Sequence, residues 1–287
     1  MKHITRDDIN DREWDGCVKE ALNGAVFATT WYLDIVCDNW EALVSEDYNI
    51  LLPLPIKQRI FMRQVYCPHL VPYLGIINRK PISPMEAMQV LQAIPYQHLS
   101  IILSPYNKLP GNASRTFSYG LLDLIRDAKQ LKKSFAPELK KAIEDYEAKN
   151  IVVIRDLTPT SYLAAIQSKP ARKATYFATL LRLISFSQRY KTSAVYAAYD
   201  RYNQLMAGAF ILRSHDRLSL IHGFDNDENK RGLKAIVYHV IKRSAGNNLT
   251  LEFPCYTRAV GQYFTRNRHL CRRYKKGLPK WISPLFQ

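Results

Sequence analysis

Two stretches of the chain carry apolar and polar residues in the same order. Residues 27–36 (FATTWYLDIV) and 177–186 (FATLLRLISF) each have the apolar spacing of a helix, and each precedes two strand-like runs. Those runs are 40–45 and 50–55 in the first stretch, and 194–199 and 204–212 in the second. The pattern predicts that a helix followed by a β-hairpin occurs twice in this protein.

The two predicted hairpins also share their turn residues. Asp47-Tyr48-Asn49 joins the first pair of runs, and DRYN at 200–203 joins the second. Asp and Asn favour turns because their side chains hydrogen-bond nearby backbone amides. A helix and a strand follow each hairpin, at 84–94 and 98–103 and again at 232–245 and 248–253. The shared order favours a tandem duplication over a chance recurrence of common hairpins.

A charged region separates the two copies. Apolar residues at helical intervals predict helices at 121–133 and 137–149, and the strand-like run IVVI follows at 151–154. The turn-forming segment 105–115 marks the expected boundary. We therefore expect a mixed α/β (α+β) chain. Its predicted parts are a first domain at 1–112, a second at 113–265, and a basic tail at 266–287 that could pack back on the first domain.

The net charge of the chain is strongly positive. Lys and Arg exceed Asp and Glu to give +16 over 287 residues. Such a charge favours an anionic partner, which could be nucleic acid, a nucleotide, a phospholipid head group or a polyanionic substrate. The alternative is that the charge serves solubility alone.

Composition argues against several other classes of protein. No apolar run is long enough to predict a membrane-spanning helix, and the polar N-terminus lacks the apolar region of a secretory signal. The five cysteines are widely spaced, odd in number and form no CxxC, which indicates reduced thiols and a cytoplasmic protein. The histidines show no HxH or HExxH spacing, so no metal site is expected.

The order of elements resembles the GNAT acyltransferase fold used twice. Tandem GNAT domains are typical of the FemAB-like acyltransferases, which include the aminoacyl-tRNA-dependent enzymes of the peptidoglycan bridge. The segments that carry the resemblance are 29–34 with 40–44, 117–123 with 135–148, and 249–253 with the next eleven or so residues. The chain departs from the family at Pro254-Cys255-Tyr256, where the family has a Glu-Gly-Ser-like turn.

The resemblance implies a site for a phosphorylated donor, either acyl-CoA or aminoacyl-tRNA. In GNAT folds a helix N-terminus holds pyrophosphate, because free amide groups and the helix dipole attract anions. The matching loop is 223–234, where Gly232 would allow close approach and Lys230, Arg231 and Lys234 would add positive charge. Three acidic residues in the same loop oppose an anion, so a solvated loop that caps the helix is the alternative.

Glu252 and Tyr263 are the candidate catalytic residues. Acyl transfer to an amine needs a neutral amine and a protonated leaving group. Glu252 alternates with the apolar Leu251 and Phe253, and it would act as a base, directly or through water. Pairing with a Lys or Arg is its alternative role. Tyr263 would protonate the leaving group, or it would pack within a helix that starts near Thr257.

Pro254 ends the strand at 249–253, because proline cannot donate to a sheet ladder. By the resemblance, the following turn would build the wall where two central strands part to admit the donor. Cys255 could act as a nucleophile, but no His or Asp lies beside it in the sequence.

The C-terminal region is dense in positive charge. Arg272, Arg273, Lys275 and Lys276 surround Tyr274, a mixture that suits RNA or another polyanion. The same residues also suit an exposed strand that positive charge protects from aggregation.

These patterns together predict a FemAB-like N-acyltransferase. It would transfer an acyl or aminoacyl group from acyl-CoA or aminoacyl-tRNA to the amine of a small molecule or peptide. One rival is a catalytically silent member that keeps the fold and binds a ligand or partner, which the altered turn favours. The other is a basic RNA-binding module.

Overall fold

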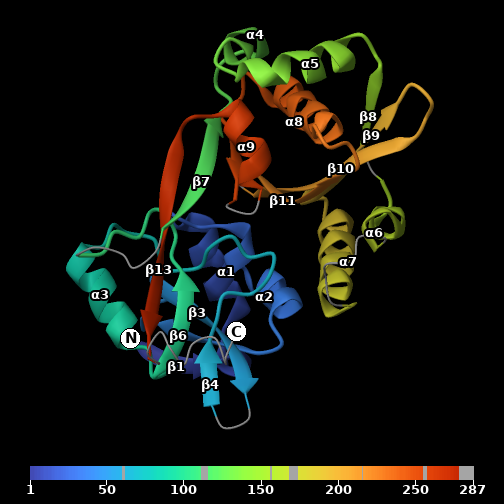
Figure 1. Ribbon diagram of the computed structural model, residues 1–287. Helices are drawn as coiled ribbons and strands as arrows, with labels where there is room; N and C mark the ends of the chain where they lie inside the picture. The colour runs from blue at the N-terminus through green and yellow to red at the C-terminus, as the bar shows by residue number, and fades with distance from the viewer. Residues whose placement is uncertain are drawn as a thin grey trace. The chain divides into compact units, whose positions relative to one another are not determined.

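A computed structural model describes residues 1–59, 62–110, 116–155, 157–167, 174–214, 216–254 and 257–277. The chain forms two compact units (Figure 1). The first contains Met1–Phe117 and Leu270–Gln287, and the second contains Ser118–His269. In the part of the chain described, no helix is long and apolar enough to cross a membrane.

The first unit contains two helices before its first hairpin and one before a later strand. Its elements are β1 (Lys2–Thr5), η1 (Arg6–Asp8), α1 (Asp11–Glu20), η2 (Val26–Ala28), α2 (Thr30–Val36), β2 (Trp40–Val44), β3 (Ile50–Arg59), β4 (Met62–Val65), β5 (Ile77–Asn78), α3 (Pro84–Gln92), β6 (His98–Ile102) and most of β13 (Arg268–Lys276).

The second unit contains a similar order of helices and strands. Its elements are most of β7 (Thr116–Asp123), then α4 (Ala128–Lys132), η3 (Pro137–Leu139), α5 (Lys140–Glu147), β8 (Ile151–Arg155), α6 (Pro159–Gln167), α7 (Ala174–Arg189), β9 (Ser193–Asp200), β10 (Leu205–Ser214), β11 (Arg217–Asp225), α8 (Arg231–Ser244), β12 (Thr250–Phe253) and α9 (Arg258–Phe264).

The strands of the two units follow the same spatial order. That order is β1-β2-β3-β4-β6-β13 in the first unit and β8-β9-β10-β11-β12-β7 in the second, and β5 also pairs with β3. The β4–β6 and β11–β12 pairs are parallel, and the other pairs printed for each unit are antiparallel. This equivalence confirms the predicted mixed α/β fold with a repeated unit. The strand β13, from the end of the described chain, pairs with β6 in the first unit, and β7, from the middle of the chain, pairs with β12 in the second.

The predicted turn chemistry is present in both hairpins. Asp47 Oδ1 accepts a hydrogen bond from the Asn49 amide at 3.1 Å. Asp200 Oδ1 accepts from the amides of Tyr202 and Gln204, both at 2.9 Å. These carboxylates replace backbone partners in the turn, which is why Asp recurs at this point in both copies.

The helix predicted at 121–133 is wrong in its first part. Leu121 and Leu122 belong to β7, where they pair with Glu252 and Leu251 of β12. The helix α4 begins only at Ala128. The side chain of Asp127 caps its start by accepting a hydrogen bond from the Gln130 amide at 2.8 Å. Pairing across the sheet has overridden a helical spacing of leucines.

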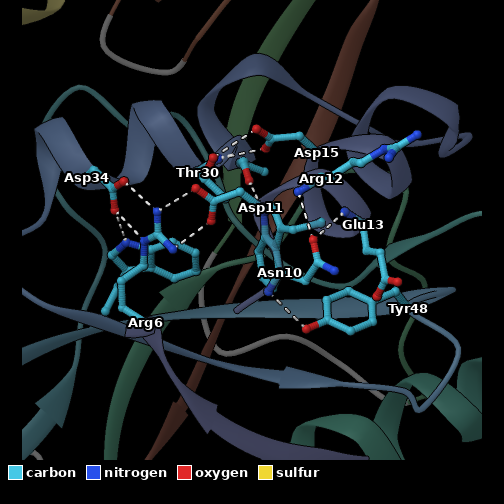
Figure 2. A network of polar contacts seen from close by, with 12 residues as sticks. Arg6, Asn10, Asp11, Arg12, Glu13, Asp15, Thr30, Asp34 and Tyr48 are labelled. Atoms are coloured by element: carbon cyan, nitrogen blue, oxygen red, sulfur yellow. Dashed lines mark hydrogen bonds and ion pairs between the residues drawn. The ribbon is translucent and has the colours of Figure 1, made fainter. Parts of the chain in front are cut away.

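A polar network holds together the start of the first unit (Figure 2). The Arg6 guanidinium donates to both carboxylate oxygens of Asp34, at 2.8 and 2.9 Å, and to Asp11 at 2.7 Å. The same guanidinium lies over the Trp40 ring, 5.3 Å from its centroid. One side chain therefore joins η1 to α1, α2 and β2.

The core of the second unit lies between α8 and the sheet. In Figure 1, α8 lies across β9, β10 and β11 and beside α5. The apolar side chains on one face of α8 are buried, and each contributes roughly 1.5–3 kcal/mol relative to exposure: they are Leu233, Ile236, Val237, Val240 and Ile241. Close approach depends on two glycines: an added Cβ would lie 2.7 Å from Ala207 Cβ at Gly232, and 2.5 Å from Phe253 Cβ at Gly261.

Candidate active site

The parallel strands β11 and β12 separate after a short contact. Residues 217–219 pair with 250–252, and the described residues show no further pairing between these strands. On its other edge β11 pairs with β10 and carries a bulge. Leu220 pairs with Ile211 and His222 pairs with Phe210, so Ile221 has no opposite residue on β10. A bulge bends a strand and increases its twist. The strand β11 therefore bends close to the point where its pairing with β12 ends.

A pocket of about 340 Å³ lies where the bulged strand ends. It is lined by Gly223, Phe224, Asp225, Asn226, Asp227, Glu228, Lys230, Leu233 and Thr257. These residues come from the end of β11, the following loop, the first turn of α8 and the start of α9. This is the region in which the sequence predicted a donor site.

Two aspartates of this loop bind the amide groups at the start of α8. Asp225 Oδ2 accepts from the Leu233 amide at 2.6 Å, and Asp227 Oδ2 accepts from the Arg231 amide at 3.0 Å. Burial alone would raise the pKa of Asp227, but the hydrogen bonds from Arg231 outweigh it and lower that pKa. The protein itself thus supplies the negative charge that a helix N-terminus attracts.

The predicted phosphate-binding residues have different environments. Lys230 is exposed and lines the pocket, in a left-handed conformation with φ 53°. The Arg231 guanidinium already binds Asp227 at 3.0 Å and Asp145 at 3.4 Å. Gly232 is buried against Ala207, so its lack of a side chain serves helix packing. Their roles as ligand contacts stay predictions.

Lys234 and Tyr263 lie together between α8 and α9. The Lys234 ammonium lies 4.0 Å from the centroid of the Tyr263 ring, and the lysine is only 6% exposed. The pair combines a predicted donor-binding residue with a predicted catalytic residue, although they are far apart in the sequence.

Glu252 is buried and fully engaged by its neighbours. Its carboxylate accepts from Tyr119 at 2.9 Å and from Ser219 at 2.5 Å, and it forms an ion pair with Arg217 at 3.2 Å. These partners come from β7 and β11, so the carboxylate ties three neighbouring strands together. The alternative of pairing with a basic residue is therefore what the structure shows, while its role as a base stays a prediction.

No family model and no curated protein matches this chain in sequence, whereas solved structures match it in fold. FemX superposes with a TM-score of 0.63 at 11% identity, over 99% of both chains. The chain has the tandem GNAT fold of FemX. L-PGS from Bacillus licheniformis gives a TM-score of 0.55 at 10% identity, over 96% of this chain and 95% of that one.

A tandem GNAT protein from the clavulanic acid biosynthesis pathway gives 0.50 at 9% identity, over 97% of this chain and 99% of that one. The fold predicted from the resemblance is therefore confirmed. At these identities the likeness extends to the fold alone, so the site has to be argued from this chain's own residues.

His222 belongs to this region of the tandem GNAT fold and was missed in the sequence. It follows the bulge on β11, and its Nδ1 lies 2.7 Å from the hydroxyl of Tyr162, which is wholly buried. Burial raises the pKa of Tyr162 well above its usual value. The feature of the sequence that could have drawn attention to it is a single histidine within the apolar run LSLIHGF.

The predicted RNA-binding residues belong to β13, not to a free tail. Side chains alternate along a strand, so Arg272 and Lys276 lie on one face while Arg273 and Lys275 lie on the other. Arg272 donates to the Leu109 carbonyl at 3.2 Å, and Arg273 lies over the Phe117 ring at 4.9 Å. The four cations therefore do not form one continuous patch.

Cys255, the candidate nucleophile, and the turn that includes Tyr256 lie outside the described residues. Among the described residues, no group of three or more His, Cys, Asp or Glu side chains could hold a metal ion.

Proposed function

We propose that this protein transfers an aminoacyl group from aminoacyl-tRNA to an amine of a small molecule or peptide. The observation that carries the proposal is the parting of β11 from β12 above an open pocket, within a tandem GNAT fold. In this reaction the amine nitrogen bonds to the ester carbonyl carbon. The bond from that carbon to the ribose oxygen breaks, and the proton lost by the amine passes to the released oxygen.

The start of α8 supports an ester donor rather than acyl-CoA. Pyrophosphate needs helix amides that are open to it, whereas Asp225 and Asp227 already accept from two of them. Glu228 adds a third acidic side chain to the lining, and Lys230 is the basic one. An aminoacyl ester brings its reacting carbonyl without a pyrophosphate group, so it does not compete with these carboxylates.

The chain's own groups can supply most of what the transfer needs. Backbone amides of β11 beyond the bulge can donate to the carbonyl oxygen as negative charge develops there. The Tyr263 hydroxyl could return a proton to the leaving ribose oxygen. Glu252 holds β7, β11 and β12 in register, so its contribution is to the geometry of the parted strands.

Transfer can be tested with a mixture of radiolabelled aminoacyl-tRNAs and a panel of amines and lysine-containing peptides. The expected product is label in an amide that survives mild base, which hydrolyses the ester donor. Parallel reactions with labelled acetyl-CoA should give no such product. Transfer from acetyl-CoA but not from charged tRNA would overturn the choice of donor.

A ligand-binding protein without transferase activity is the second candidate. It is favoured by the full engagement of Glu252, which leaves no evident free base on β12. If no donor is consumed while an amine or a tRNA still binds measurably, this second function takes the place of the first.

A further inference from the structure

Lys234 is a buried lysine whose charge has no direct acceptor. It is 94% removed from solvent, on the first turn of α8, yet the described chain contains no hydrogen bond or ion pair to its ammonium. Buried cations are normally paired, and an unpaired one needs an explanation. In the described chain, Lys234 Nζ is not among the fully enclosed side-chain atoms that lack a hydrogen bond. Lys234 Nζ therefore still reaches solvent.

Its neighbours hold this ammonium without neutralising it. The Tyr263 ring, 4.0 Å away, attracts the cation through its π face but accepts no proton from it in a hydrogen bond. Asp227 feels the charge of Lys234, but it makes its hydrogen bonds to Arg231. Three N–H donors of Lys234 thus remain for an oxygen from outside the chain.

We propose that Lys234, oriented by Tyr263, is the binding site for a singly charged oxyanion. The local charges favour one negative charge over a pyrophosphate group, because Asp225, Asp227 and Glu228 line the neighbouring pocket and Arg231 is already paired with Asp227 and Asp145. The neighbouring pocket lies at the end of β11 and the start of α9.

Two sources could supply this oxyanion, and the choice between them rests on the proposed function. It is either the oxygen that gains charge on the ester carbonyl during transfer, or a carboxylate or phosphodiester that the bound substrate already carries. Both present the same chemistry to Lys234, and kinetics distinguish them.

The direct test uses acetate as the probe. Thermal unfolding is followed as sodium acetate replaces sodium chloride at constant ionic strength, for the wild type, Lys234→Met and Lys242→Met. The control Lys242 is an exposed lysine on the same helix whose ammonium lies 6.0 Å from the Tyr146 ring. Met keeps the buried aliphatic chain of Lys234, and Lys234→Leu replaces it if that variant does not fold.

Acetate should raise the melting temperature of the wild type and of Lys242→Met, because it binds only the folded state. The Lys234 variants should lose this response. An equal response in Lys234→Met, or none in the wild type, overturns the site.

Transfer kinetics then identify the source of the oxyanion. If the charge develops during the reaction, Lys234→Met should lower kcat by about 10²–10³-fold with little change in KM. If the substrate carries the charge, KM should rise while kcat is kept. Kinetic constants equal to the wild type overturn a role in transfer. If the wild type transfers nothing, the proposed function fails, while the acetate measurement still decides the site.

Discussion

Glu252 and Asp34 are carboxylates whose neighbours hold them in place, and they differ in how much water reaches them. The side chain of Glu252 is 2% exposed, whereas that of Asp34 is 41% exposed. Removing the charge of Glu252 leaves buried hydrogen-bond donors unsatisfied, whereas the partners of Asp34 can still be solvated if its charge is removed. The two residues therefore call for different measurements.

Glu252→Gln should lower the free energy of unfolding by about 2–4 kcal/mol. The amide accepts fewer hydrogen bonds and removes the buried one of the two carboxylates that pair with Arg217, leaving the exposed Asp216. Urea denaturation would measure the loss, with Glu228→Gln in the exposed loop as the control. A variant as stable as the wild type but inactive in transfer would instead support Glu252 as the base.

Asp34 should make stability sensitive to acid. Burial would raise the pKa of Asp34, but the hydrogen bonds from Arg6 and Trp40 prevail and lower it. A carboxyl whose folded pKa is depressed stabilises the fold above its unfolded pKa of about 3.9, and this contribution is lost as the pH falls through the folded value. The difference in urea stability between the wild type and Asp34→Asn should therefore shrink below about pH 4. A constant difference down to pH 2 would contradict the assignment.

At the scale of whole elements, α8 and α9 depend on glycines that let them approach the sheet. A Cβ at Gly232 would lie 2.7 Å from Ala207 Cβ and 3.0 Å from Met206 Cβ. Gly16, in the middle of α1, has only the Arg79 Nη2 atom at 3.6 Å near the same position. An added methyl group would therefore meet close neighbours at Gly232 but not at Gly16.

Gly232→Ala should destabilise the protein by about 1–3 kcal/mol, since the added methyl overpacks the start of α8. Gly16→Ala should be neutral or stabilise by up to about 1 kcal/mol, because alanine favours a helix more than glycine does. Chemical denaturation of both variants checks the contrast. Equal effects would mean that α8 can move away from β10 without cost.

The whole chain carries a net charge of +16. Any affinity for tRNA should therefore have a large electrostatic part, and counterion release makes such binding weaken with salt. The basic side chains of β13 differ in how exposed they are to solvent, and therefore in how readily they could contact tRNA phosphates. Lys275 and Lys276 are exposed, whereas Arg272 and Arg273 are partly buried and contact Leu109 and Phe117.

Lys275→Gln with Lys276→Gln should reduce the slope of log affinity against log salt by at most about 2, roughly one for each lost phosphate contact. Arg272→Gln with Arg273→Gln should mainly lower stability. Filter binding of tRNA over a series of salt concentrations, beside a melting curve, separates the two effects. No binding of tRNA at low salt would remove aminoacyl-tRNA as the donor.

The sequence by itself determined the repeated architecture and its turns. Helix–hairpin–helix–strand order is a local property, written in apolar spacing and in turn residues such as Asp47 and Asp200. It also identified Glu252, Lys234 and Tyr263 as residues of interest. Local pattern could not say what these side chains contact, because their partners lie on other elements of the fold.

Only the tertiary structure decided the state of the site. Tyr119 reaches Glu252 across 133 positions of the chain, and the bulge in β11 exists only in its pairing with β10. The capping of α8 by Asp225 and Asp227, and the isolation of the Lys234 ammonium, depend likewise on three-dimensional packing. A sequence lists the charges near a helix start, whereas geometry determines which of them are already paired and which one remains for a ligand.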